Sequence, residues 1–576
     1  MKRVPAASQF LIFFLRFAPL VSFLILELNC AGQGPPSGGS PDSTPPTVVS
    51  TFPEQNTTDF RGNRLVFEFS EYVDRRSVED AFFVSPSLGP LEFEWSGREV
   101  EVAFDQPLRE QITYVVTIGT DVKDVRAGNR MTESFTLAFS TGAHIDSAAI
   151  EGRVFDEKAE GLTVLAYNLS RWSSDSLDPA VCKPDYATQT GKGGAFRLEH
   201  LAWGTYRILV IRDQYKNLLY DPQVDEYGVL TRDVELNRDR PFVPGLQSRM
   251  TKEDTTRPFL LDARAFERNL ARMRFSEPVN PFDLVSGSVV ITDTTTSESI
   301  SILDISYMIR PPSTVLLTTG DLDSANTYRL VVESVRDTAG NLISTKSNAA
   351  IFRGSDTRDT TKPYVFSMSV SDSARDIAFD ASLSLTFSEP VVRSSFEHGF
   401  RLVDSTGSDV EGMFRWESSG RVMFLPSRPL LPFAWYRIRI VLDSLCDRSG
   451  NHFVDSVFSR AFQTITTRKL GSIRGIVDDR LSNDSSLVYV FATSVTDKLA
   501  APRAIELARP GSFEFTDLPE GKYQLSAFRD SNGDGRFGYG KPFSFAPAER
   551  FAVYPDTVKV RARWPLEGVV IRFEGE

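Results

Sequence analysis

The sequence predicts an all-β protein, with five antiparallel β-sandwich domains in series, and three observations support this. The segment 383–391 (Leu-Ser-Leu-Thr-Phe-Ser-Glu-Pro-Val) alternates apolar and polar residues, and variants of it occur at 65–73 and 271–279. A second phrase, containing Gly-x-Phe and then Tyr ten residues after the Phe, occurs at 194–206 and 511–523. No stretch after residue 30 has a helical period long enough to rival the strands. The repeats therefore predict domains of two kinds.

The alternating segment predicts which side chains form the core. In a half-buried strand, every second side chain faces the same way. The inward residues should be Leu383, Leu385 and Phe387 in one copy, and in the other two Leu65, Phe67, Phe69, Ala271, Met273 and Phe275.

Length and composition limit the class of protein. A chain of 576 residues is too long for one hydrophobic core, and 41% hydrophobic with 24% charged residues is typical of a globular chain. The net charge of -12 argues against a nucleic-acid partner. Cys182 and Cys446 fall in different predicted domains, which argues against a disulfide framework.

The N-terminus has the order of an export signal. Lys2 and Arg3 precede an apolar run over 10–26, and a Gly/Pro/Ser tract follows Cys30. The alternative is an uncleaved membrane anchor, in which Arg16 would be costly. The run 26–30 (Leu-Glu-Leu-Asn-Cys) resembles the lipobox of bacterial lipoproteins, with departures at Glu27 and Asn29. That resemblance implies a signal peptide over 1–29, lipidation of Cys30 and a Pro/Gly tether over 30–44.

Three segments share the alternating strand and further signals at fixed offsets: 45–142, 256–354 and 361–466. In each, a Leu precedes a Tyr-led strand by six residues, and an Asp-led turn ending in Gly-Asn follows. These motifs, with a closing Phe-x-Thr in the first and third copies, resemble the SbsA-type bacterial Ig-like domain. The resemblance implies a two-sheet antiparallel sandwich.

The segments 148–240 and 470–576 share the second phrase. Its pattern, Gly-x-Phe-x-Phe/Leu-x-x-Leu-x-x-Gly-x-Tyr, resembles the carboxypeptidase-regulatory-like, prealbumin-like sandwich. Despite the name, the resemblance implies a non-catalytic spacer or binding accessory.

Repeated carboxylates are the first candidates for chemistry. Glu71, Glu277 and Glu389 each end an alternating strand. A catalytic or metal role is one interpretation; the favoured one is that each accepts backbone N–H bonds from the next loop. In the Asp-led turns, Asp124, Asp337 and Asp447 should form Asx-turns, with Gly128, Gly340 and Gly450 taking positive φ.

A loop near the C-terminus is the second candidate. Asp530, Asn532, Asp534 and the carbonyl of Arg536 match the first ligands of a calcium loop, but Lys541 stands where such a loop needs a bidentate Glu. Calcium, with Glu549 as the replacement ligand, is one interpretation, and a plain Asx-rich hairpin turn is the other and favoured one.

No catalytic motif appears, and the four histidines have no ligand spacing, so the protein is predicted not to be an enzyme. No cofactor is required, with calcium the one candidate. We expect an exported outer-membrane lipoprotein, periplasmic or surface-facing, that forms an elongated structural or adhesive arm. The alternative is an accessory that binds carbohydrate or a partner protein for an uptake or glycan-processing system.

Overall fold

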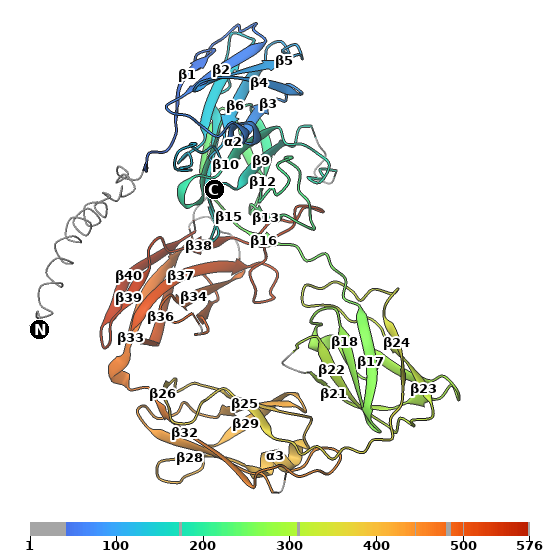
Figure 1. The fold of residues 1–576 in the computed structure, drawn as a ribbon. Helices are drawn as coiled ribbons and strands as arrows, with labels where there is room; N and C mark the ends of the chain where they lie inside the picture. Colours follow the sequence, from blue (N-terminus) through green and yellow to red (C-terminus); the bar gives the residue numbers. More distant parts are fainter. Residues whose placement is uncertain are drawn as a thin grey trace, which may run out of the picture.

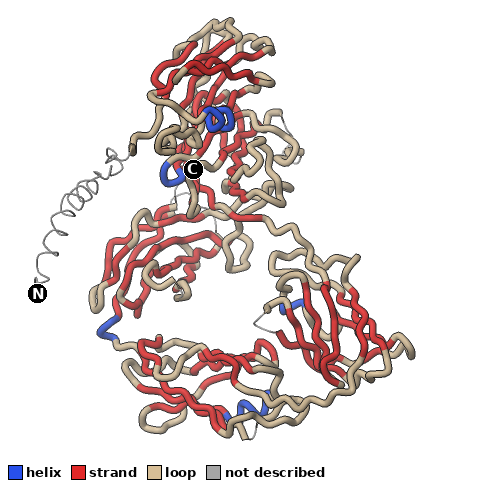
Figure 2. The backbone as a smooth tube through the Cα atoms, viewed as in Figure 1, coloured by secondary structure: helices blue, strands red, loops and turns tan. Residues whose placement is uncertain are grey.

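The computed structural model describes residues 42–171, 176–307, 311–443, 445–479, 485–498 and 500–573. The predicted signal peptide and Cys30 lie outside these residues. The described chain is built of strands and loops, with ten sheets and the short helices α2 (Arg75–Asp80) and α3 (Arg393–Gly399) (Figures 1 and 2). Among the described residues, no helix combines the length and apolar character needed to cross a bilayer. The predicted all-β class is confirmed.

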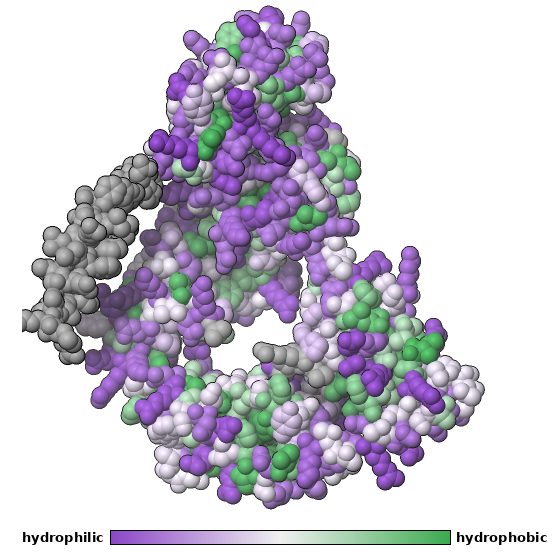
Figure 3. Space-filling view, in the orientation of Figure 1, coloured by the Kyte–Doolittle hydropathy of each residue, from purple (hydrophilic) through white to green (hydrophobic). Residues whose placement is uncertain are grey.

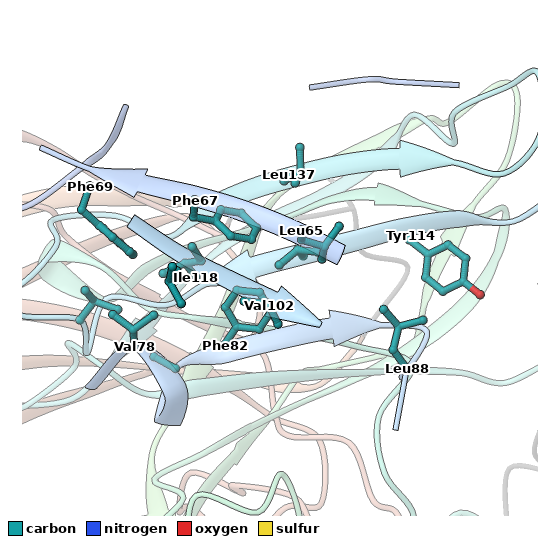
Figure 4. Close-up of a cluster of buried hydrophobic side chains, with 14 of the residues drawn as sticks. Leu65, Phe67, Phe69, Val78, Phe82, Leu88, Val102, Tyr114, Ile118 and Leu137 are labelled. Carbon is teal, nitrogen blue, oxygen red and sulfur yellow. The ribbon is translucent and has the colours of Figure 1, made fainter. Parts of the chain in front are cut away.

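The first Ig-like domain pairs two sheets. One has the order β1 (Val48–Phe52), β2 (Arg64–Phe69), β5 (Glu99–Phe104), β4 (Leu91–Ser96), and the other β3 (Phe82–Ser85), β6 (Thr113–Ile118), β7 (Phe135–Ser140). Leu65, Phe67 and Phe69 are fully buried between them, as predicted (Figure 4).

The second Ig-like domain repeats this plan. Its sheets are β17 (Leu260–Glu267), β18 (Leu270–Phe275), β22 (Thr314–Thr319), β21 (Ile302–Tyr307) and β20 (Ser299–Ile300), β19 (Val289–Asp293), β23 (Thr327–Val332), β24 (Ala349–Arg353). Ala271, Met273 and Phe275 are fully buried, which confirms their prediction.

The third Ig-like domain has β25 (Val365–Met368), β27 (Leu383–Phe387), β30 (Arg421–Pro426), β29 (Gly412–Ser418) in one sheet. The other contains β26 (Ala374–Ile377), β32 (Val457–Thr464), β31 (Trp435–Val441), β28 (Phe400–Asp404), and its β26 runs parallel to β32. Leu383, Leu385 and Phe387 are buried, as predicted.

The module predicted at 148–240 is the first of the two that share the second phrase. It has a small sheet with the order β11 (Ala195–Leu201), β8 (Ala148–Phe155), β15 (Phe242–Arg249). Its larger sheet contains β10 (Tyr186–Gln189), β9 (Thr163–Asn168), β12 (Gly204–Ile211), β13 (Glu226–Val229), β16 (Thr251–Lys252), with β14 (Val234–Leu236) beside β12. Strand β15 pairs in parallel with β8, so this module extends past the expected boundary at residue 240.

The C-terminal module repeats that topology. Its small sheet is β36 (Ser512–Pro519), β33 (Leu470–Asp478), β40 (Pro565–Arg572), with β33 and β40 parallel. The larger sheet is β35 (Arg503–Leu507), β34 (Leu487–Ser494), β37 (Gly521–Asp530), β38 (Phe551–Val553), with β39 (Val558–Val560) beside β37. The shared phrase thus encodes one topology in both modules.

The chain returns on itself instead of forming the elongated series that we expected. The C-terminal module packs on the module that contains strands β8 to β16: Tyr227 donates its hydroxyl to the carbonyl of Gly540 at 2.8 Å, and Arg207 lies 3.6 Å from the ring centre of Phe545. The last four domains surround a central opening (Figures 1 and 3). The chain folds back because this buries apolar surface. Ala548 and Phe545 of the C-terminal module complete an apolar cluster on the outer face of the module that contains β8 to β16.

Candidate functional site

The most distinctive polar feature is a carboxylate cluster at the start of the second and of the third Ig-like domain. Each cluster takes one Asp from the linker before the domain, one Glu after its alternating strand, and the Asp of its Gly-Asn turn. In the second domain these are Asp254, Glu277 and Asp337, and in the third Asp359, Glu389 and Asp447. In each set, one oxygen per residue lies within 4.8 Å of the others.

In the third Ig-like domain, backbone N–H groups of the Asp-led turn hold the aspartate that begins the turn. Asp447 Oδ1 accepts bonds from the backbone N–H of Ser449 (2.8 Å) and Asn451 (2.9 Å), and Gly450 takes a φ of 89°. Asp337 and Asp124 accept equivalent bonds in their own turns, so the predicted Asx-turns are confirmed.

The asparagine that ends each turn holds the linker. Asn451 Nδ2 donates to the carbonyl of Asp359 at 3.2 Å, and Asn341 and Asn129 do the same for Asp254 (2.7 Å) and Asp42 (3.1 Å). One turn therefore places two of the three carboxylates of a cluster.

The glutamates correct our expectation. Glu277 and Glu389 were predicted to accept backbone N–H bonds from the next loop, but Oε1 of each is buried and has no hydrogen-bond partner in the described structure. The physical reason is that the loop aspartate has already taken the available N–H groups. Both glutamates instead point a solvent-excluded oxygen at like charges.

The pKa values reflect this crowding. Burial raises the pKa of Glu389 to about 8, with further increases from Asp359, Asp447 and Glu267. Burial, Asp359 and Asp447 likewise raise the pKa of Glu267 to about 7.

The equivalent glutamates of the other two Ig-like domains also have raised pKa values. The pKa of Glu277 is raised by burial, Asp254 and Asp337. The pKa of Glu71 is raised by burial, Asp124 and Asp42, but Arg126 acts in the opposite direction.

Sequence reasoning missed the linker aspartates, although a signal was present. Asp42, Asp254 and Asp359 each open an Asp-Ser/Thr-Thr-x-Pro phrase just before the predicted domain starts at 45, 256 and 361. This motif is short and lies before the repeated strand. The alternation of apolar and polar residues, from which the domains were predicted, therefore gives no information about these aspartates.

The loop after β37 is closed by its own backbone. The Asp530 carboxylate accepts bonds from the N–H groups of Gly533 (2.7 Å), Asp534 (3.2 Å) and Gly535 (2.9 Å), and Asp534 Oδ1 accepts one from Arg536 (2.7 Å). This is the geometry of an Asx-rich turn. Asp213 accepts comparable bonds from Asn217 and Leu218 in the sister module.

Glu549 reaches this loop, but it also accepts protein bonds. Its Oε1 accepts from the backbone and hydroxyl of Ser531 (2.7 and 2.9 Å), and Oε2 accepts from the Gly538 N–H at 2.9 Å.

Calcium at the Asp530 loop stays a prediction. Because the backbone already uses these oxygens, we expect Asp534→Ala to leave any calcium-dependent thermal shift of the full chain unchanged. Melting curves of both proteins in calcium and in chelator measure this, and a shift abolished by Asp534→Ala would instead assign calcium to the loop.

Comparisons with known proteins show that two segments of the chain are similar to a family of domains. Residues 42–141 and 359–464 match the model of the bacterial Ig-like domain, so the matches begin at the linker aspartates Asp42 and Asp359. No curated protein sequence gives a significant match to the chain.

Solved structures give distant likenesses. The N-terminal part of the bacterial S-layer protein SbsC is 14% identical with a TM-score of 0.17, and the match covers 36% of this chain and 44% of that one. L,D-transpeptidase 1 from Mycobacterium tuberculosis is 14% identical (TM-score 0.16; 34% of this chain, 90% of that one). Native alpha-2-macroglobulin from E. coli is 10% identical (TM-score 0.14; 90% and 34%). The chain thus spans less than half of the SbsC structure that it matches.

Proposed function

We propose that the protein is a non-catalytic cell-envelope lipoprotein, held at the outer membrane by a lipid on Cys30, with a structural or adhesive role. The observation that carries this proposal is that the described chain is a set of β-sandwiches, each with its own core. An Ig-like sandwich is a scaffold on which function must be added as a site. The folded-back arrangement makes the scaffold a compact frame on a Pro/Gly tether.

The lipid anchor is tested at its cysteine. We expect Cys30→Ser to abolish labelling with a palmitate analogue and to move the protein from the membrane to the soluble fraction, because the thioether site is lost. Cys182→Ser is the matched control, since Cys182 is a free, half-buried cysteine within a domain. Equal labelling of wild type and Cys30→Ser would refute the anchor.

A cleft favours the alternative role as a carbohydrate- or partner-binding accessory. It lies between the second and third Ig-like domains, has a volume of about 780 Å³, and is lined by Phe282, Tyr307, Trp416 and Arg421 among others. Phe282 is 89% exposed, and aromatic faces beside charged groups suit sugar rings. Glycan-array binding that is lost in Phe282→Ala would favour the accessory role, and the absence of any glycan binding would favour the structural one.

A further inference from the structure

The acidic cluster between the second and third Ig-like domains has charge that the protein does not balance. Asp359, Glu389 and Asp447 converge to within 4.8 Å, and Glu389 Oε1 is buried without a partner. In the described parts of the chain, no lysine or arginine forms an ion pair with these three carboxylates. Arg448, next to Asp447, contacts Asp304 at 3.2 Å instead. A buried carboxylate oxygen without a partner is costly, so a missing positive ligand is the simplest explanation.

We propose that Asp359, Glu389 and Asp447 bind a calcium-type divalent cation at this junction, and that Asp254, Glu277 and Asp337 bind a second one. The donors are all carboxylate oxygens, which hard cations prefer. They come from a linker, a strand end and a turn, and Ca²⁺ tolerates such an irregular set better than Mg²⁺, which demands near-ideal octahedral geometry.

The third-domain cluster borders a cavity on its Glu389 side. Glu389 lines a cavity of about 190 Å³, together with Ser306 and Tyr307 of the preceding domain. Calcium takes six to eight oxygens, so water can complete a shell that three carboxylates begin.

The cation would connect two domains. Arg268, which follows strand β17 of the second domain, donates its backbone N–H to the linker carbonyl of Thr357 at 2.9 Å. The same linker supplies Asp359 to the third-domain cluster. A cation held by Asp359, Glu389 and Asp447 would therefore stiffen this joint beside the central opening.

The first Ig-like domain provides an internal comparison. There, among the described residues, Asp42, Glu71 and Asp124 do not converge as the three carboxylates of each of the other two domains do. We therefore propose two cation sites and not three. The physiological supply rests on the proposed export, because calcium is millimolar outside cells and sites of this class bind with Kd of about 0.1–1 mM.

The test is calcium titration of the full chain purified in detergent, by calorimetry and by thermal melting. We expect two bound ions per chain, and melting of the second and third Ig-like domains raised by about 4–8 °C at saturating calcium. Glu389→Gln should remove one ion and Glu277→Gln the other. Asp534→Ala, which alters only the C-terminal loop, should keep both.

One further readout keeps the proposal falsifiable. Because Gln relieves like-charge repulsion, Glu389→Gln should melt at or above the wild-type temperature in chelator, but below it in calcium.

Three results would overturn the proposal: no calcium binding by the wild type at 10 mM (about ten times the upper Kd), two ions still bound by the Glu277→Gln/Glu389→Gln double variant, or no crossover of the melting order. These outcomes are independent of the lipid anchor, because the titration needs no membrane. A failed palmitate test would refute the anchor and leave the cation sites standing.

Discussion

Asp479→Ala should destabilise the C-terminal module by about 3–5 kcal/mol, because it removes a carboxylate that forms an ion pair with a buried guanidinium. The Asp479 and Arg529 side chains are 0% and 2% exposed, and they pair at 2.9 Å. Arg550, partly exposed, forms a second ion pair with the same carboxylate at 2.9 Å. Removing the Asp479 carboxylate therefore affects two cations, one of them deep in the module.

The measurement is denaturant-dependent hydrogen exchange of strands β33, β34 and β37, which reports this module within the full chain. Asp478→Ala is the matched control, since its partner Arg572 is 58% exposed and such a pair contributes at most about 1 kcal/mol. Equal effects of the two substitutions would contradict the buried-charge argument.

The same pair predicts a dependence on pH. Burial opposes ionisation of Asp479, but hydrogen bonds from Arg550 and Arg529 outweigh it, so its pKa is lowered from 3.8. A carboxyl with a lowered folded-state pKa contributes stability above its unfolded pKa, and that contribution is lost as the pH falls through the folded value. The difference between wild type and Asp479→Ala should therefore be full at neutral pH and shrink only below about pH 4.

The strands could be predicted because alternating apolar and polar residues directly indicate a strand with one buried face. Phe69, Phe275 and Phe387 share a position in three copies, and each is buried as the period of two requires. The Asx-turns could be predicted for a similar reason. Asp447 and Gly450 belong to a turn of five residues, and the hydrogen bonds that hold it join residues close in the sequence.

The clusters and the closed arrangement depend on contacts that no local pattern records. Val391 pairs with Asp447 across the domain, and only this pairing brings the end of the alternating strand to the turn. The closing contact of Tyr227 with Gly540 joins residues 313 apart in the chain. A repeated phrase fixes each module's topology, but the surface on which modules meet is set by residues outside the phrase, such as Phe545.

Phe387→Ala should destabilise the third Ig-like domain by about 3–5 kcal/mol, because it removes a buried ring and leaves a cavity. Phe387 is 4% exposed, and its ring centre lies 5.2 Å from that of Phe396 and 6.4 Å from that of Trp416. The domain has its own core, so strands β18 and β22 of the second domain should keep their exchange protection while β27 and β30 lose it. Phe433→Ala is the control, since Phe433 is 65% exposed and its loss should cost less than about 0.5 kcal/mol. If β18 and β27 lost protection together, the two domains would unfold as one cooperative unit, and the separate cores would not be the units of stability.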